Sequence, residues 1–245
     1  MSRYFIEVGY KGTNYAGFQK QDNANTIQSE VEKALLTYFR TEINLTGSSR
    51  TDAGVHARQN FFHFDIEETG KAIDFNKSIY HINAILPLDI VVRSIKPVTP
   101  DAHCRFDATA RTYEYIVYQV KDPFMNGLGY FYPYQIDLED LRQLAGELIN
   151  HTDFESFAKR NTQVHTFKCT IFKSEWVLMP GYLLYRVKAN RFLRGMVKGL
   201  VGTMLRSASN KHSIDQFRSI ILSQNPSKVD FAVPSHGLTL IEVSF

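Results

Sequence analysis

Hydrophobic residues recur at every second position in several short segments of the first hundred residues, which is the spacing of half-buried strands. Four such segments are predicted to be strands: residues 4–8, 43–45, 62–66 and 90–95. Two segments between them repeat their apolar residues every three or four positions, as amphipathic helices do. The first helix is predicted to begin at a reciprocal cap formed by Asn25 and Gln28. The second is predicted to begin at Asp74 and to end before Pro87.

A similar order of elements begins again after residue 110. Alternation predicts strands over four segments: residues 113–119, 171–177, 183–189 and 238–243. Helical spacing predicts three helices: residues 137–148, 193–207 and 214–222. The sequence therefore indicates an α+β protein with two ferredoxin-like βαββαβ units, the second carrying one extra helix, and a continuous, mostly antiparallel sheet. We expect an N-terminal lobe at residues 1–100 and a C-terminal lobe at residues 101–245.

The composition narrows the class of protein without indicating an activity. The chain has 245 residues, of which 44% are hydrophobic, so we expect a globular protein rather than a disordered one. No run approaches the roughly 18 apolar residues of a membrane span, and the first residues lack the apolar core of a signal peptide. We therefore expect a cytoplasmic protein without a membrane segment. The net charge of +3 is too small to indicate a nucleic-acid partner by itself.

The sequence contains no recognisable cofactor or metal motif. Cys104 and Cys169 stand alone, without the spacing of a zinc site or a disulfide framework. His56 and His63 lack a third ligand at a recognisable spacing, which favours hydrogen-bonding roles over metal binding. Glycine-rich nucleotide-binding motifs are also absent from the sequence. We expect neither a cofactor nor a metal.

A polar segment rich in small residues, residues 47–57, separates two predicted strands of the first lobe. Two interpretations are open. In the first, Asp52 accepts backbone N–H groups ahead of Gly54 as a structural turn, and Arg50 is a solvated surface charge. In the second, Arg50 and Asp52 bring a cation and a carboxylate to one groove, where the cation helps to keep the carboxylate ionised. Composition alone favours the structural turn.

Residues 50–57 read Arg-Thr-Asp-Ala-Gly-Val-His-Ala and strongly resemble the RTDAGVHA signature of the tRNA pseudouridine synthase A (TruA) family. Further segments resemble that family in the same order along the chain: residues 10–19, 83–90, 105–115, 153–157, 189–202 and 232–240. The resemblance implies the pseudouridine synthase fold and a cofactor-independent isomerase. It further implies that the substrate is uridine at positions 38, 39 and 40 in the anticodon stem-loop of tRNA, and that the protein is a homodimer.

The resemblance also implies roles for individual residues. Asp52 is the catalytic carboxylate, which acts either as a nucleophile toward C1′ or as a base toward C2′. Tyr113 stacks on the extruded uracil and assists proton removal from C5, and Arg50 helps to keep the base flipped. Lys198 stands where the family has arginine, so its role as partner of the carboxylate lacks the bidentate geometry of arginine. Leu240 matches a position that packs near the site.

Contacts with tRNA are implied for a second group of residues: Arg50, Arg105, Gln163, His165 and Arg194. Cationic side chains at such positions meet phosphates and supply affinity that does not depend on sequence. Without the resemblance, a solvated helical face explains Arg194 and its basic neighbours equally well. Tyr113 would then be an ordinary core residue of its strand.

Several other positions depart from the pattern of the family: Lys11, Phe18, Ser49, Gln59 and Asn60. Two other functions also stay open. A catalytically silent RNA-binding module would share the two ferredoxin-like units but would have no use for a carboxylate facing phosphate. A nucleoside or glycoside hydrolase would need a second carboxylate near Asp52, and the sequence offers no candidate.

Overall fold

The computed structural model describes residues 1–67, 74–160 and 164–245. The chain divides into two compact units. Unit 1 comprises Met1–Thr109 together with Leu240–Phe245, and unit 2 comprises Ala110–Thr239. The last six residues therefore return to the unit that contains the first residues of the chain.

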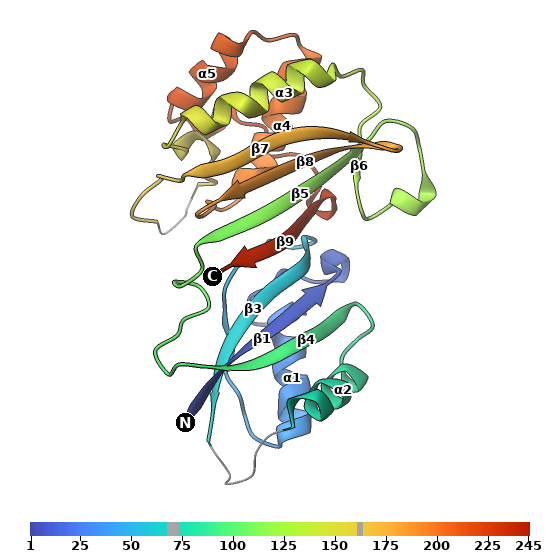
Figure 1. The fold of residues 1–245 in the computed structure, drawn as a ribbon. Coiled ribbons are helices and arrows are strands. Elements are labelled where there is room, and N and C mark those ends of the chain that lie inside the picture. Colours follow the sequence, from blue (N-terminus) through green and yellow to red (C-terminus); the bar gives the residue numbers. More distant parts are fainter. Residues whose placement is uncertain (68–73, 161–163) are drawn as a thin grey trace. The chain divides into compact units, whose positions relative to one another are not determined.

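Unit 1 has a three-stranded antiparallel core in which β1 (Ser2–Tyr10) pairs with both β3 (His56–Ile66) and β4 (Ile90–Val98). The two-residue strand β2 (Thr46–Gly47) and the strand β9 (Leu238–Ser244) both pair with β3. The helices are α1 (Ile27–Phe39) and α2 (Phe75–Ile85), which lie on one face of these strands (Figure 1). Apolar residues of both layers are fully buried between them: Ile6, Val8, Val31, Leu35, Phe62 and Ile82.

Unit 2 has an antiparallel sheet in which β8 (Tyr182–Ala189) pairs with β5 (Ala110–Tyr118) and β7 (Ile171–Met179). The short strand β6 (Tyr130–Phe131) pairs with β5 in parallel. Helix α3 (Leu138–Glu147) contacts β7, α4 (Met196–Ser209) and α5 (Ile214–Leu222). The described residues of the two units also contain six short 3₁₀ helices: Gly12–Asn14, Pro123–Met125, Leu148–Asn150, Glu155–Phe157, Pro226–Lys228 and Ser235–Gly237.

The predicted α+β class and the mostly antiparallel pairing are confirmed. Helices α2 and α3 begin after the expected caps, because Asp74 accepts a hydrogen bond from the Lys77 amide and Asp137 accepts one from the Glu139 amide. Helix α4 begins at Met196 rather than near residue 193, because Gly195 has the left-handed φ of 73° and cannot continue a helix. No helix in the described ranges is long and apolar enough to cross a membrane.

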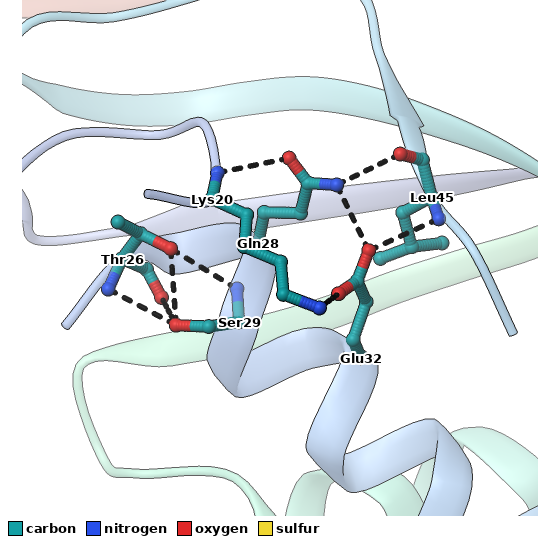
Figure 2. Close-up of polar contacts among 6 residues, drawn as sticks. All are labelled: Lys20, Thr26, Gln28, Ser29, Glu32 and Leu45. Atoms are coloured by element: carbon teal, nitrogen blue, oxygen red, sulfur yellow. Dashed lines mark hydrogen bonds and ion pairs between the residues drawn. The ribbon is translucent and has the colours of Figure 1, made fainter. Parts of the chain in front are cut away.

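The predicted cap of α1 is wrong by one residue. Thr26 is the capping residue: its hydroxyl accepts a hydrogen bond from the Ser29 amide, and the Ser29 hydroxyl accepts one from the Thr26 amide (Figure 2). Asn25 and Gln28 do not form the cap. Gln28 is thereby available for another partner, since its side-chain amide donates to the backbone carbonyl of Leu45 at 2.8 Å.

The predicted strand at residues 43–45 is also wrong, because these residues are irregular and only Thr46–Gly47 pairs with β3. Ile43 and Leu45 are nevertheless buried, which explains their apolar pattern. Side chains of α1 take the place of a neighbouring strand: Gln28 donates to the Leu45 carbonyl, and Glu32 accepts from the Leu45 amide at 3.2 Å (Figure 2). Helix α1 therefore fixes the segment that leads into residues 47–57.

Candidate functional site

The segment between β2 and β3 is a loop with a buried side and an exposed side. Ser49, Thr51 and Val55 are buried, whereas Arg50 is exposed and Asp52 is half-buried. Residues that alternate in this way along an extended segment project to opposite sides of it. The loop therefore fastens itself to the interior of unit 1 through one set of residues and presents Arg50 and Asp52 outward.

Side chains from two paired strands hold the buried side of this loop. The Tyr10 hydroxyl of β1 lies 2.8 Å from Oγ1 of Thr51. Asn60 of β3 donates from Nδ2 to the Tyr10 oxygen at 3.1 Å and to the Ser49 carbonyl at 2.8 Å. The Ser49 amide donates back to Oδ1 of Asn60 at 3.3 Å. Burial raises the pKa of Tyr10, so the phenol stays protonated at neutral pH.

Backbone contacts hold the loop at three more points. The Phe18 amide donates to the Thr51 carbonyl at 3.1 Å, and the Gly12 amide donates to Nδ1 of His56 at 2.9 Å. The turn ahead of Gly54 is closed by the Val55 amide, which donates to the backbone carbonyl of Asp52 at 3.2 Å. A main-chain hydrogen bond therefore closes the turn that contains Asp52.

The packing around the loop has little free space. A Cβ atom at Gly12 would lie 2.0 Å from the carbonyl oxygen of Val55, so the two backbones approach too closely for any other residue. Phe18 stacks on Phe62 at 4.4 Å between ring centroids, and a Cβ at Gly47 would meet the Phe18 ring at 2.2 Å. Phe18 thus fills the space between Gly47 and Phe62, and the loop rests on a closely packed base.

Two of the implied site residues lie in unit 2. Tyr113 is a half-buried residue of β5, and its ring meets Phe192 edge to face with the centroids 5.1 Å apart. Lys198 is a half-buried residue in the first turns of α4, where Nζ donates to Oγ of Ser235 at 3.2 Å. Leu240 is fully buried in β9 and belongs to unit 1 with Asp52.

The implied tRNA-contacting residues are mostly exposed. Arg105 of unit 1 is exposed, and its guanidinium carbon lies 5.9 Å from the centre of the Phe106 ring. His165 and Arg194 of unit 2 are exposed. Gln163 lies outside the described residues. Exposed cations are available to phosphates, although such exposure is also ordinary for surface residues.

A second group of polar residues in unit 1 includes His63 and Cys104, and the sequence favoured a hydrogen-bonding role for His63. Nδ1 of His63 lies 3.3 Å from Sγ of the buried Cys104, and that thiol donates to the Thr46 carbonyl at 3.2 Å. Burial lowers the pKa of His63, and the positive charges of nearby groups lower it further. Among the described residues no group of three or more His, Cys, Asp or Glu side chains could hold a metal ion. These contacts fasten the start of β2 to the segment before β5.

Sequence reasoning also missed Tyr10, Gly12 and Asn60 as residues that shape the candidate site. Tyr10 and Gly12 lie in a segment that resembles the family, but the resemblance gave them no function. Asn60 was noted only as a departure from the family pattern. The signal that could have identified Asn60 is a polar residue in an otherwise apolar alternation, since a buried amide needs specific partners.

Known proteins resemble this chain over nearly all of its length. The family model of tRNA pseudouridine synthase matches residues 7–107 and 144–245. A protein of Parabacteroides distasonis named tRNA pseudouridine synthase A is 41% identical over 245 residues, which cover all of this chain and 96% of that protein.

Two further relatives carry the same name. The protein of Bacteroides fragilis is 42% identical over all of this chain and 97% of its own length. A protein of Staphylococcus aureus strain JH1 is 36% identical over 98% of this chain and 90% of its own length. Identity at this level over the whole chain, together with the loop that carries Arg50 and Asp52, shows that the chain belongs to the tRNA pseudouridine synthase family.

Proposed function

We propose that this protein converts uridine to pseudouridine at positions 38, 39 and 40 in the anticodon stem-loop of tRNA, with Asp52 as its catalytic carboxylate. The names of its relatives support tRNA as the substrate. The observation that carries the proposal is the loop itself. Asp52 is half-buried and two residues from the exposed Arg50, on a segment whose alternate residues are fixed in the interior of unit 1.

The reaction is an internal rearrangement that needs one well-placed carboxylate. The bond between N1 of uracil and C1′ breaks, the base turns, and C5 forms a new bond to C1′. N1 gains a proton, C5 loses one, and no electrons are exchanged with another molecule. A carboxylate can capture C1′ covalently while the base turns, as in retaining glycosidases, or can remove a proton from C2′ to give a glycal. Asp52 serves either route.

The other site residues handle the base and the charge. Uridine in a stem is paired and stacked, so it must be extruded at a cost of a few kcal/mol and held against an aromatic face. In this proposal Tyr113 supplies that face, and its hydroxyl assists proton removal from C5. Arg50 keeps the base flipped and meets the adjacent phosphates, Lys198 partners the carboxylate, and Leu240 packs against the site.

The remaining roles concern the rest of the tRNA and the assembly. Four residues contact tRNA beyond the target base: Arg105, Gln163, His165 and Arg194. The contribution of Arg105 and Arg194 is electrostatic and falls as the salt concentration rises. The enzyme works as a homodimer in the cytoplasm, and its chemistry requires neither a cofactor nor a metal.

The test is release of tritium from tRNA that carries uridine tritiated at C5. The unaltered protein is expected to release label from the anticodon-stem positions, whereas Asp52→Asn is expected to release none while still binding tRNA. Asp65→Asn is the matched control, because Asp65 forms an exposed ion pair with Arg3 and such pairs contribute little to stability.

Three outcomes would contradict the proposal. Tight tRNA binding without tritium release by the unaltered protein would favour a silent RNA-binding module. Release of free uracil would favour a hydrolase. Full activity in Asp52→Asn would remove the carboxylate from the reaction. Substrate deuterated at C2′ then separates the two routes, because only the glycal route breaks a bond to that atom.

A further inference from the structure

We infer that Tyr10 and Asn60 are positioning residues. They hold Ser49 and Thr51 in place and thereby determine where the side chains of Arg50 and Asp52 lie. The inference rests on the proposed role of Asp52. Neither residue touches substrate in this account, because both are buried: Tyr10 is 5% exposed and Asn60 is not exposed. They act on the loop from its interior side.

Asn60 uses the whole hydrogen-bonding capacity of its amide. Oδ1 accepts from the Ser49 amide at 3.3 Å and from the Phe61 amide at 2.9 Å. Nδ2 donates to the Ser49 carbonyl at 2.8 Å and to the Tyr10 oxygen at 3.1 Å. Two donors and two acceptors are all that an asparagine amide offers. Asn60 therefore hydrogen-bonds both the amide and the carbonyl of Ser49, as a neighbouring strand would. These bonds allow its side-chain amide only one orientation.

Tyr10 connects Asn60 to Thr51, which is the next buried residue of the loop after Ser49. Its oxygen accepts from Asn60, because Nδ2 can only donate, and the same hydroxyl lies 2.8 Å from Oγ1 of Thr51. Ser49 and Thr51 are the two neighbours of Arg50, and Thr51 precedes Asp52. Fixing both neighbours leaves the outward residues little freedom to shift along the loop.

The two positioning residues come from paired strands, next to an irregularity in their register. Val8 is paired with Asn60, and Tyr10 with Ala57, so β3 contains one extra residue between these pairs. Such an irregularity twists a strand and redirects side chains, and it is common beside active sites. Here the side chains of Tyr10 and Asn60 are both buried and meet at the loop. Residues that hold a site to within a fraction of an ångström are best placed on paired strands of this kind.

The chain offers a matched control for a purely structural role. Tyr185 of unit 2 is fully buried, and its hydroxyl lies 2.9 Å from Oγ of Ser174. The pair resembles Tyr10 with Thr51, because each is a buried contact between a tyrosine and an aliphatic hydroxyl, at 2.9 Å and 2.8 Å respectively. Removing the Tyr185 hydroxyl deletes this contact, whereas removing the Tyr10 hydroxyl also deletes the hydrogen bond from Asn60, and only Tyr10 contacts the loop.

The experiment measures tritium release from C5-tritiated tRNA, with kcat and KM determined separately, together with the thermal midpoint of each variant. Tyr10→Phe is expected to lower kcat by about 10- to 100-fold with KM for tRNA almost unchanged, because a small misplacement of a reacting group slows the chemical step. Tyr185→Phe is expected to lower the thermal midpoint as well, while kcat stays within about twofold of the unaltered protein.

A double-mutant cycle shows whether Tyr10 acts through Thr51. Thr51→Val removes the partner hydroxyl and keeps the side-chain shape, so it is expected to lower kcat as Tyr10→Phe does. Because both changes delete the contact between Tyr10 and Thr51, the double variant is expected to be no slower than the slower single variant. Thr51→Val also serves if Tyr10→Phe fails to fold.

The outcomes separate this inference from the proposed function. No release by the unaltered protein would overturn both. Release by the unaltered protein with unchanged kcat in Tyr10→Phe would overturn the positioning role alone. Equal losses of kcat in Tyr10→Phe and Tyr185→Phe, or loss of folding in both Tyr10→Phe and Thr51→Val, would also overturn it, because a general effect on the fold would then explain the result.

Discussion

Each unit contains a polar cluster that fastens parts far apart in the sequence, but the two clusters differ in charge. In unit 1 the hydrogen bonds among Tyr10, Thr51 and Asn60 are all between neutral groups. In unit 2 Arg218 of α5 donates to Glu147 of α3 at 2.7 Å, and His151 lies 2.9 Å from the same carboxylate oxygen. The neutral cluster holds an irregular loop, whereas the charged cluster joins two regular helices.

The difference follows from what each cluster holds. A charged group buried behind the loop would alter the electrostatic potential at the site that the loop presents. Neutral hydrogen bonds fix geometry without adding a charge, and they demand specific directions from their partners. Helices already have a fixed shape, so an ion pair between Glu147 and Arg218 adds stability without needing to define a conformation. The next three predictions test this division.

The largest effect is expected from Gly12→Ala, which breaks the backbone packing on the unit 1 side. The new Cβ would lie 2.0 Å from the Val55 oxygen and 2.8 Å from its carbon, and neither backbone atom can rotate away. The segment from Val55 to His56 must therefore shift, and we expect kcat for tritium release to fall by about 100-fold or more. Amide hydrogen exchange over residues 48–56 should rise as well. Unchanged exchange and turnover would contradict the close packing of Gly12 against the loop.

An intermediate effect is expected from Glu147→Gln in unit 2, on stability rather than on turnover. Hydrogen bonds from Arg218 hold the pKa of Glu147 at about 2, below its ordinary value of 4.5. A lowered carboxyl pKa contributes stability above the unfolded pKa, and this contribution is lost as pH falls from about 4.5 toward 2. Urea unfolding at pH 7 should show a loss of about 1–2 kcal/mol in the variant, with the difference shrinking below about pH 4.5.

The control for this measurement lies on the same helix. Glu139 of α3 forms a pair with Arg142 at 3.7 Å, and its side chain is 65% exposed. Glu139→Gln should change the free energy of unfolding by less than about 0.5 kcal/mol at any pH, because exposed pairs are weak. A difference between Glu147→Gln and the unaltered protein that persists at pH 2 would show that the ionised carboxylate is not its source.

The smallest effect is expected from Gly146→Ala in α3. A Cβ at this helical position meets no atom within 4 Å, in contrast to the backbone contact at Gly12. Alanine loses less conformational entropy than glycine when a helix forms, so unfolding in urea should require about 0.5–1 kcal/mol more. Turnover should not change. A lower free energy of unfolding in Gly146→Ala would contradict the open space beside this position of α3.

Sequence patterns predicted the fold best where one residue both ends a loop and begins a helix. Asp74 and Asp137 do so, and both caps were correct. At α1 two residues that could cap the helix, Asn25 and Thr26, are adjacent. Thr26 forms the cap because its partner Ser29 completes the reciprocal hydrogen bonds. The strand predicted at residues 43–45 was wrong for a different reason. Their apolar pattern indicates burial. The Leu45 backbone is hydrogen-bonded by side chains of α1, and the spacing of apolar residues does not indicate such partners.

The candidate site likewise contains residues that the sequence could identify and residues that it could not. Arg50 and Asp52 could be identified from a contiguous motif, because the chemistry of the loop is written in consecutive residues. Tyr10 and Asn60 are fifty positions apart, and their contact depends on the pairing of β1 with β3 and on the extra residue in β3. Register irregularities of this kind arise from the packing of the whole sheet and leave no local trace in the sequence.

The return of residues 240–245 to unit 1 has a consequence for the order in which the protein is made. Every residue of unit 2 leaves the ribosome before the last part of β9, so unit 2 can close while unit 1 still lacks that part of its sheet. Domains generally fold as units during synthesis, from the N-terminus onward. Here the unit that contains Asp52 is translated first and completed last. A released chain truncated after residue 239 should therefore protect unit 2 from protease better than it protects the loop around Asp52.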